Sequence, residues 1–146
     1  MNKGTLRAIC ISPERGQLKT PVLEARIIEN CGIENDGHAG DWGRQVTCLN
    51  YASVEKVSKE LGKEIHPGEF AENLLIEGID LAGRMEAGKR LKIGEEAVLE
   101  VSQIGKEDHP SVVTRTMGVS LLPSEGLFCR VIAGGVIRTG DMVEVI

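Results

Sequence analysis

The chain has 146 residues and a mass of 15.8 kDa, a length that supports one domain spanning residues 1–146. Hydrophobic residues make up 41% and charged residues 27%, which is typical of a globular protein and argues against disorder. Aromatic residues are only 3% and the net charge is −5, so the chain lacks the stacking surfaces and the excess of cations that nucleic-acid binding needs.

The sequence also argues against export and membrane insertion. Arg7 and residues 13–15 interrupt the apolar residues near the start, so we expect no signal peptide. The longest weakly polar run, residues 131–137, is far shorter than the ~20 residues of a membrane span. The four cysteines form no C-x-x-C pair, which is typical of reduced thiols in a cytoplasmic protein. They are Cys10, Cys31, Cys48 and Cys129.

Strand patterns dominate the chain. The first expected strand, residues 4–12, carries apolar side chains on both faces, and strict alternation puts Leu6 and Ala8 on the same face. Residues 90–102 predict a hairpin, because alternating apolar positions flank a turn at Gly94. The other expected strands are residues 23–28, 45–49, 73–76, 127–132 and 142–146.

Helical signals are fewer. Apolar residues recur at helical spacing at Val54, Val57 and Leu61. Asn50 is a suitable N-cap and Gly62 a suitable C-terminal glycine, so we predict a helix between them. Residues 78–81 favour a short helical turn, and the unpatterned residues 109–126 predict a long loop. About seven to eight short strands with one or two short helices predict a mainly β fold, a closed or nearly closed β-barrel.

A glycine-rich segment, residues 32–43, is followed at once by Arg44. Its four glycines would let backbone N–H groups approach an anion, and the planar guanidinium of Arg44 suits phosphate or carboxylate. The alternative is a barrel connection whose glycines serve only tight turns. The segment matches neither G-x-G-x-x-G nor G-x-x-x-x-G-K-[ST], so it does not indicate an ordinary nucleotide site.

The three histidines are candidate ligands for a small molecule or a metal. His38 lies within the glycine-rich segment and could donate a hydrogen bond to a bound molecule. His66 and His109 each precede a proline, which predicts turns at both positions. The spacing of the three residues is not that of a zinc site.

Further polar and thiol residues have two interpretations each. Glu72 is either one of a pair of carboxylates for acid–base chemistry or a solvated turn residue. Asn73 opens an apolar strand and could direct its amide into the mouth of the barrel. Cys31 lies beside the glycine-rich segment. Cys129 either packs in the core or is activated by the neighbouring Arg130, whose cation would lower the thiol pKa.

Several motifs follow one another in a recognisable order. They occupy residues 32–40, 44–47, 67–74, 78–81, 91–94, 99–106 and 126–131. In this order and spacing they resemble the MOSC domain family, named for the C-terminal domain of molybdenum cofactor sulfurase, in its small standalone bacterial form. The resemblance covers nearly the whole chain.

The resemblance implies a β-barrel that binds molybdenum cofactor or molybdopterin and acts as a carrier or accessory in cofactor biosynthesis or sulfuration. The implied partners are the pterin cofactor and molybdoenzymes or cofactor-biosynthesis proteins. The alternatives are a small molybdenum-cofactor-dependent reductase of N-hydroxylated compounds and a non-catalytic interaction barrel, as a monomer or homodimer. Pyridoxal phosphate belongs to the separate transferase domain of the sulfurase, and no site for it is evident in this sequence.

The resemblance also implies which residues bind the cofactor. These are His38, Arg44, Glu72, Asn73, Lys106 and Arg130. Within this set, Lys106 and Arg130 would hold the anionic end of the cofactor.

The chain departs from the family at one position. Relatives carry a cysteine just after the Ile-Gly-Lys-Glu segment, where this chain has Asp108. A carboxylate cannot form a persulfide, so sulfur transfer through this position is excluded, and Cys31 or Cys129 would have to replace the missing thiol. Asp108 could instead ligate a metal as a hard oxygen donor, which leaves Asp108 and Cys129 as the catalytic candidates.

Overall fold

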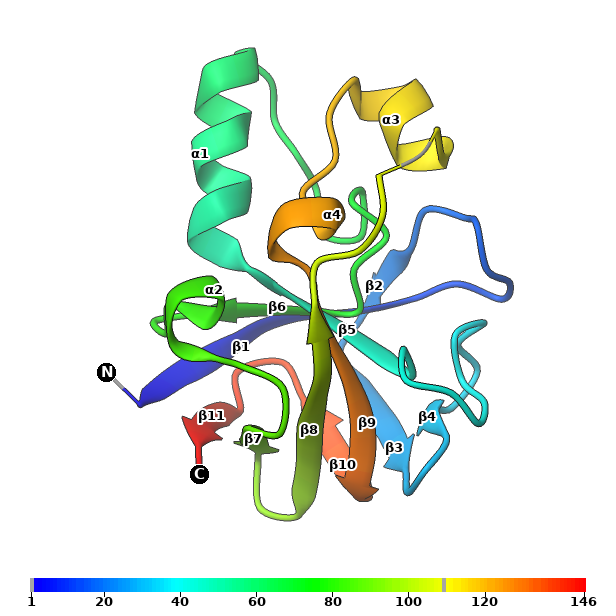
Figure 1. Ribbon diagram of the computed structural model, residues 1–146, viewed down its shortest axis with the longest axis vertical. Helices are drawn as coiled ribbons and strands as arrows, with labels where there is room; N and C mark the ends of the chain where they lie inside the picture. Colours follow the sequence, from blue (N-terminus) through cyan, green and yellow to red (C-terminus); the bar gives the residue numbers. More distant parts are fainter. Residues whose placement is uncertain (1, 109) are drawn as a thin grey trace.

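The structure is a computed structural model that describes residues 2–108 and 110–146 (Figure 1). Its strands are β1 (Lys3–Ile11), β2 (Thr20–Val22), β3 (Glu24–Ile28), β4 (Gly32–Ile33), β5 (Val46–Asn50), β6 (Leu74–Glu77), β7 (Arg90–Ile93), β8 (Ala97–Ile104), β9 (Leu127–Ala133), β10 (Gly135–Arg138) and β11 (Met142–Val145). Its helices are α1 (Tyr51–Leu61), α2 (Leu81–Arg84), α3 (Val112–Met117) and α4 (Leu122–Glu125).

Seven strands close into a barrel in the order β11-β7-β8-β9-β5-β6-β1, and β1 pairs with β11 to complete the ring. Strand β2 extends the sheet beyond β1. Strands β5 and β6 are parallel, and α1 lies in the connection between them, as a parallel pair requires. The prediction of a mainly β closed barrel is confirmed.

A second, three-stranded sheet has the order β10-β3-β4. The sequence patterns predict β3 but miss β2, β4 and β10. These strands have two to four residues each, which is too short to show an alternating pattern.

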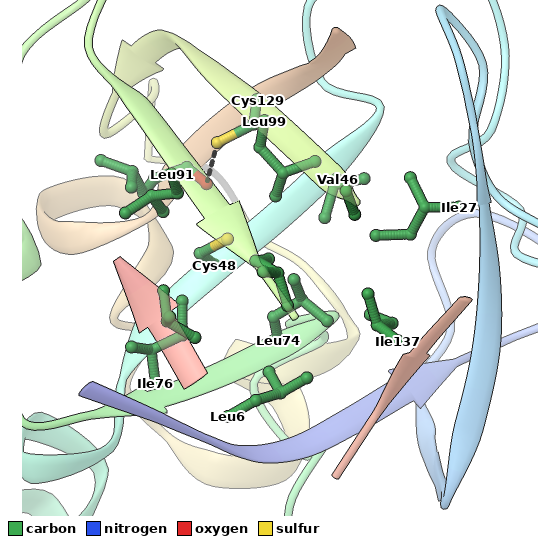
Figure 2. Close-up of a cluster of buried hydrophobic side chains, with 14 of the residues drawn as sticks. Leu6, Ile27, Val46, Cys48, Leu74, Ile76, Leu91, Leu99, Cys129 and Ile137 are labelled. Atoms are coloured by element: carbon green, nitrogen blue, oxygen red, sulfur yellow. Dashed lines mark hydrogen bonds between the residues drawn. The ribbon is translucent and has the colours of Figure 1, made fainter. Parts of the chain in front are cut away.

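Apolar side chains fill the barrel, and Figure 2 shows Leu6, Leu74, Leu99 and Cys129 converging there from four strands. A second apolar cluster lies outside the barrel wall and includes Ala8 together with residues of α1, α3 and α4. Strand β1 therefore buries both faces, as predicted. Leu6 and Ala8 nevertheless belong to different clusters, because the pairing of β1 with β6 shifts register between them.

Helix α1 confirms the predicted helix and both of its caps. The Asn50 side chain accepts a hydrogen bond from the backbone of Ala52, and Gly62 ends the helix at a positive φ of 64°. The predicted turn at residues 78–81 overlaps the start of α2.

The prediction of an unstructured loop over residues 109–126 is wrong, because this segment contains α3 and α4. A capping box between Ser111 and Thr114 starts α3, and Gly118 ends it. Figure 1 shows α1, α3 and α4 gathered at one end of the barrel. Within the residues that the structure describes, no helix is long and apolar enough to cross a membrane.

Candidate functional site

A pocket of ≈ 340 Å³ opens at the helix-covered end of the barrel. Residues of the glycine-rich segment, the ends of β5 and β9, and helix α3 line it. Three cationic side chains lie in this lining: Arg44, Lys106 and Arg115. The described lining residues include no carboxylate, so the pocket has the charge that favours an anionic ligand.

His38 and Trp42 form one wall of the pocket. The two rings are nearly parallel, with centroids 6.0 Å apart and an interplanar angle of 8°. The indole Nε1 donates to the backbone oxygen of His38 at 2.7 Å, and the guanidinium of Arg15 lies 3.8 Å from the centroid of the Trp42 ring. This wall therefore consists of two aromatic rings, and the guanidinium of Arg15 covers one face of the indole.

The His38 ring is neutral at pH 7. Burial is the largest cause that lowers its pKa, and the neighbouring Lys19 lowers it further. Asp36 acts in the opposite direction but does not compensate, so the pKa falls from 6.5 to about 4. His38 thus contributes hydrogen bonding rather than charge to the pocket.

Arg44 lies at the side of the pocket next to an aromatic ring. Its guanidinium carbon is 5.2 Å from the centroid of Phe128, and Nη2 is 3.2 Å from an oxygen of Glu107. The Glu107 side chain is 65% exposed, so this ion pair is a solvated one that an anionic ligand can replace.

The backbone N–H groups at the centre of the glycine-rich segment are not free to bind an anion. The N–H groups of residues 36–40 and 42 all donate to acceptors within the protein. Close packing explains the glycine at position 37, because a Cβ there would lie 2.4 Å from the backbone of Glu14. The segment therefore contributes the side chains of His38 and Trp42 to the pocket. Its backbone fits the alternative interpretation, in which the glycines serve a tight connection.

Glu72 and Asn73 lie outside the described lining of the pocket. The Glu72 carboxylate is buried and accepts from the backbone N–H groups of Gly68 (2.8 Å) and Phe70 (3.1 Å). Burial raises its pKa to about 7, although those hydrogen bonds oppose the change. The Asn73 amide accepts from the backbone of Thr47 and donates to Cys10 O, which joins two strands of the barrel. Both side chains therefore hydrogen-bond to backbone groups and have a structural role.

Arg130 and the two cysteines are also placed away from this lining. Arg130 pairs with Asp41 at 3.6 Å and donates to Asn30 at 3.4 Å. Cys129 is fully buried in the barrel (Figure 2), where a hydrogen bond with Cys48 and desolvation raise its pKa well above the usual range. A thiol in this environment packs as a core residue and does not meet a ligand as a thiolate. Cys31 is half-buried in the glycine-rich connection.

Asp108 is exposed and lies outside the described lining of the pocket. Among residues 2–108 and 110–146, no group of three or more His, Cys, Asp or Glu side chains is arranged to hold a metal ion. His109, which was expected in a turn, lies outside the described residues. A metal site at Asp108 therefore has no supporting ligand cluster in the part of the chain that the structure describes.

Sequence reasoning missed Arg115, Trp42 and the buried pair Lys19 and Asp36 as parts of this site. Arg115 was missed because residues 109–126 were predicted to be a loop. Ser111 followed by Thr114 has the spacing of a capping box and indicates the helix that carries Arg115. Lys19 shows no signal in the sequence, because an isolated lysine between short strands is usually solvated.

Seven strands close around an apolar interior, and a pocket lined by three cationic side chains lies beside the short helices. These features define a small β-barrel protein. Residues 35–144 match the MOSC domain, and the chain belongs to the MOSC domain family. This family is linked to molybdenum cofactor binding. No curated protein sequence matches the chain.

Solved structures share the fold at low sequence identity. The YuaD protein from Bacillus subtilis is 17% identical with a TM-score of 0.77, covering 98% of this chain and 95% of that one. YiiM from Geobacillus stearothermophilus is 19% identical with a TM-score of 0.76, covering 98% and 75%. YiiM from Escherichia coli is 18% identical with a TM-score of 0.72, covering 99% and 69%. At these identities the similarity shows the fold.

Proposed function

We propose that the pocket binds molybdopterin or the metal-loaded molybdenum cofactor, and that the protein is a carrier or accessory in cofactor biosynthesis. The observation that carries this proposal is the lining itself, in which Arg44, Lys106 and Arg115 surround a space without a described carboxylate in a MOSC-family chain. Molybdopterin is a pterin with a dithiolene and a phosphate. Its phosphate suits the cations, and His38 and Trp42 provide an aromatic wall beside which the pterin can lie.

The described donors fit the pterin and phosphate parts of the cofactor but supply no soft ligand for a metal. None of the four cysteines lines the pocket in the described part of the chain. Metal bound to the dithiolene would therefore receive at most oxygen or nitrogen donors from this lining. These contacts suit a protein that holds and passes on the cofactor, with its partners among molybdoenzymes or cofactor-biosynthesis proteins.

The test is anaerobic binding of molybdopterin and of metal-loaded cofactor to the purified protein. Pterin retained after gel filtration is measured as its fluorescent oxidised derivative. Arg44→Ala removes a pocket cation, and Arg130→Ala is its matched control, because both arginines are partly exposed and pair with an exposed acid. We expect the Kd to rise about tenfold or more in Arg44→Ala and to change little in Arg130→Ala.

Two results would contradict the proposal. Absence of binding by the unaltered protein would remove the cofactor from this pocket. Equal weakening in both variants would show that net charge, and not the pocket, attracts the pterin.

The alternative of a protein-interaction barrel would need exposed apolar side chains around α3 and α4. Val113, Met117 and Leu122 are instead buried, and Val119 is 39% exposed. The described surface of this segment therefore favours a structural cover for the pocket over a docking patch.

A further inference from the structure

A buried polar cluster lies directly behind His38. The side chains of Lys19 and Asp36 have no exposed surface, and their charged atoms are 2.7 Å apart. The Lys19 Nζ also lies 3.1 Å from Ser12 Oγ and 3.0 Å from His38 Nδ1. The proposed cofactor contacts make no use of this cluster.

The hydrogen-bond donors of Lys19 determine whether His38 Nδ1 donates or accepts a hydrogen bond. An ammonium group has three N–H donors and no acceptor, and three acceptors surround it: an oxygen of Asp36, the hydroxyl of Ser12 and Nδ1 of His38. Nδ1 must therefore be unprotonated and accept. In a neutral imidazole the proton then resides on Nε2.

The carboxylate of Asp36 is the buried counter-ion of Lys19. One oxygen accepts from Lys19 and from the backbone of Ser12 at 3.1 Å, and the other accepts from the backbone of His38 at 3.2 Å. A carboxylate with this many donors is well stabilised without solvent, and a buried ammonium ion needs such a partner.

The lysine is also fixed at its backbone. Its N–H donates to the oxygen of Gly68 at 3.0 Å, and a Cβ at Gly68 would lie 2.0 Å from the oxygen of Lys19. Gly68 is in turn held by the carboxylate of Glu72. Hydrogen bonds thus connect Glu72 to Gly68 and Gly68 to Lys19, although Glu72 does not line the pocket.

The protonated edge of His38 faces the pocket. Nδ1 is turned toward the buried Lys19, while the side chain is 21% exposed and belongs to the pocket lining. Within residues 2–108 and 110–146, Nε2 has no hydrogen-bond partner, and no buried side-chain nitrogen or oxygen in that part of the chain lacks one. Nε2 is therefore accessible from the pocket.

We infer that Lys19 is a positioning residue that holds His38 in the Nε2–H form, so that His38 donates one directed hydrogen bond to an acceptor atom of the bound molecule. The identity of that molecule rests on the proposed function, but the state of His38 does not. The pocket then combines three cations, which recognise an anion, with a neutral donor, which recognises an oxygen or unprotonated ring nitrogen.

The first experiment measures the state of the ring in the protein without ligand. The imidazole nitrogens of ¹⁵N-histidine-labelled protein are recorded by NMR at pH 7, and the signals of His38 are identified by their loss in His38→Gln. We expect one tautomer, with Nδ1 at the chemical shift of an unprotonated nitrogen and Nε2 at that of a protonated one. A protonated Nδ1 would overturn the inference whether or not the protein binds molybdopterin.

The second experiment tests the role of Lys19. The double variant Lys19→Met, Asp36→Asn removes both buried charges together and keeps one oxygen, which can accept from one of the two backbone donors, Ser12 or His38. We expect its His38 ring to populate both tautomers. Retention of a single Nε2–H form would show that Lys19 does not set the tautomer. If this variant does not fold, the measurement on the unaltered protein still decides the tautomer.

The third experiment measures the donor in binding. His38→Gln places an amide N–H near the position of Nε2, whereas the shorter His38→Asn cannot reach it. With molybdopterin as the probe, we expect Gln to retain affinity about tenfold better than Asn, the difference of one hydrogen bond. Equal loss in the two variants would contradict donation from Nε2, and absence of binding by the unaltered protein would contradict only the proposed function.

Discussion

The interior of the barrel and the polar cluster behind His38 bury side chains of opposite character. The interior holds apolar residues such as Leu6, Leu74 and Leu99, which contact one another without directed bonds. The polar cluster contains Lys19 and Asp36, whose charged atoms each have several partners. Apolar packing depends on volume, whereas the buried polar cluster depends on every donor having its acceptor. The two regions should therefore respond differently to substitution.

The largest effect is expected from breaking the buried ion pair. Asp36→Ala leaves the Lys19 ammonium without its counter-ion and leaves the backbone N–H groups of Ser12 and His38 without their acceptors. We expect the free energy of unfolding to fall by about 4 kcal/mol, measured by urea denaturation. The double variant Lys19→Met, Asp36→Asn should lose less than Asp36→Ala alone. A larger loss in the double variant would mean that the charges themselves stabilise the fold.

The barrel interior should lose somewhat less from a single truncation. Leu74 is fully buried, and Leu74→Ala removes its contacts and leaves a cavity. We expect a loss of about 3 kcal/mol in urea denaturation. Leu74→Met, which conserves volume, should lose less than about 1.5 kcal/mol. Similar losses in the two variants would indicate that the interior is not tightly packed.

The pH dependence of stability should separate the two regions further. The pKa of His38 is lowered from 6.5 to about 4, so its stabilising contribution is complete above pH 6.5 and is lost as the pH falls through 4. The difference corresponds to at most about 3 kcal/mol, which partial exposure of the ring reduces to about 2 kcal/mol. Between pH 7 and pH 4, His38→Gln should therefore lose about 2 kcal/mol less than the unaltered protein.

The titration of Glu72 also changes stability with pH, so the effect of His38 must be measured by comparing the unaltered protein with His38→Gln. The pKa of Glu72 is raised to about 7, so the buried carboxylate becomes easier to accommodate as the pH falls from 7 toward 4.5, which has the opposite sign to the contribution of His38. The unaltered protein can therefore show a shallow curve in this range. Parallel curves for the unaltered protein and His38→Gln, followed by thermal denaturation, would contradict a lowered pKa at His38.

The smallest effect is expected at the rim of the pocket. Glu107→Gln breaks the ion pair with Arg44, but the Glu107 side chain is 65% exposed. We expect no measurable change in the free energy of unfolding, and a small increase in molybdopterin affinity because Arg44 loses its competitor. Weaker binding in this variant would show that Glu107 itself contacts the ligand.

The barrel could be predicted from the sequence because strands such as β8 alternate between buried and less buried residues with period two. Helix α1 could be predicted because Asn50 and Gly62 mark its two ends. The bulge in β1 could not, since the register shift after Leu6 depends on pairing with β6. Helix α3 was missed although Ser111 and Thr114 are spaced as a capping box.

The candidate site was predicted less completely. His38, Arg44 and Lys106 lie together in the pocket lining. The glycine-rich segment pointed to His38 and Arg44, and the family resemblance pointed to Lys106. The burial of Lys19 depends on Asp36 and Gly68, which are distant in the chain and meet it only in the folded protein. The polar side chains of Glu72 and Asn73 could bind either a ligand or backbone groups of the protein. Only their contacts in the folded protein show that they bind backbone groups.

The pairing that closes the barrel has a consequence for synthesis of the protein. Strand β1 meets β11 through the pairs of Lys3 with Glu144 and of Thr5 with Met142. These partners are separated by almost the whole chain, so the loop that they close is among the largest available and carries a high entropic cost. The barrel cannot close on the ribosome until residues 142–144 have emerged. Until then, β1 and β7 each present an unpaired edge, which makes this interval the one in which the chain depends most on protection from aggregation.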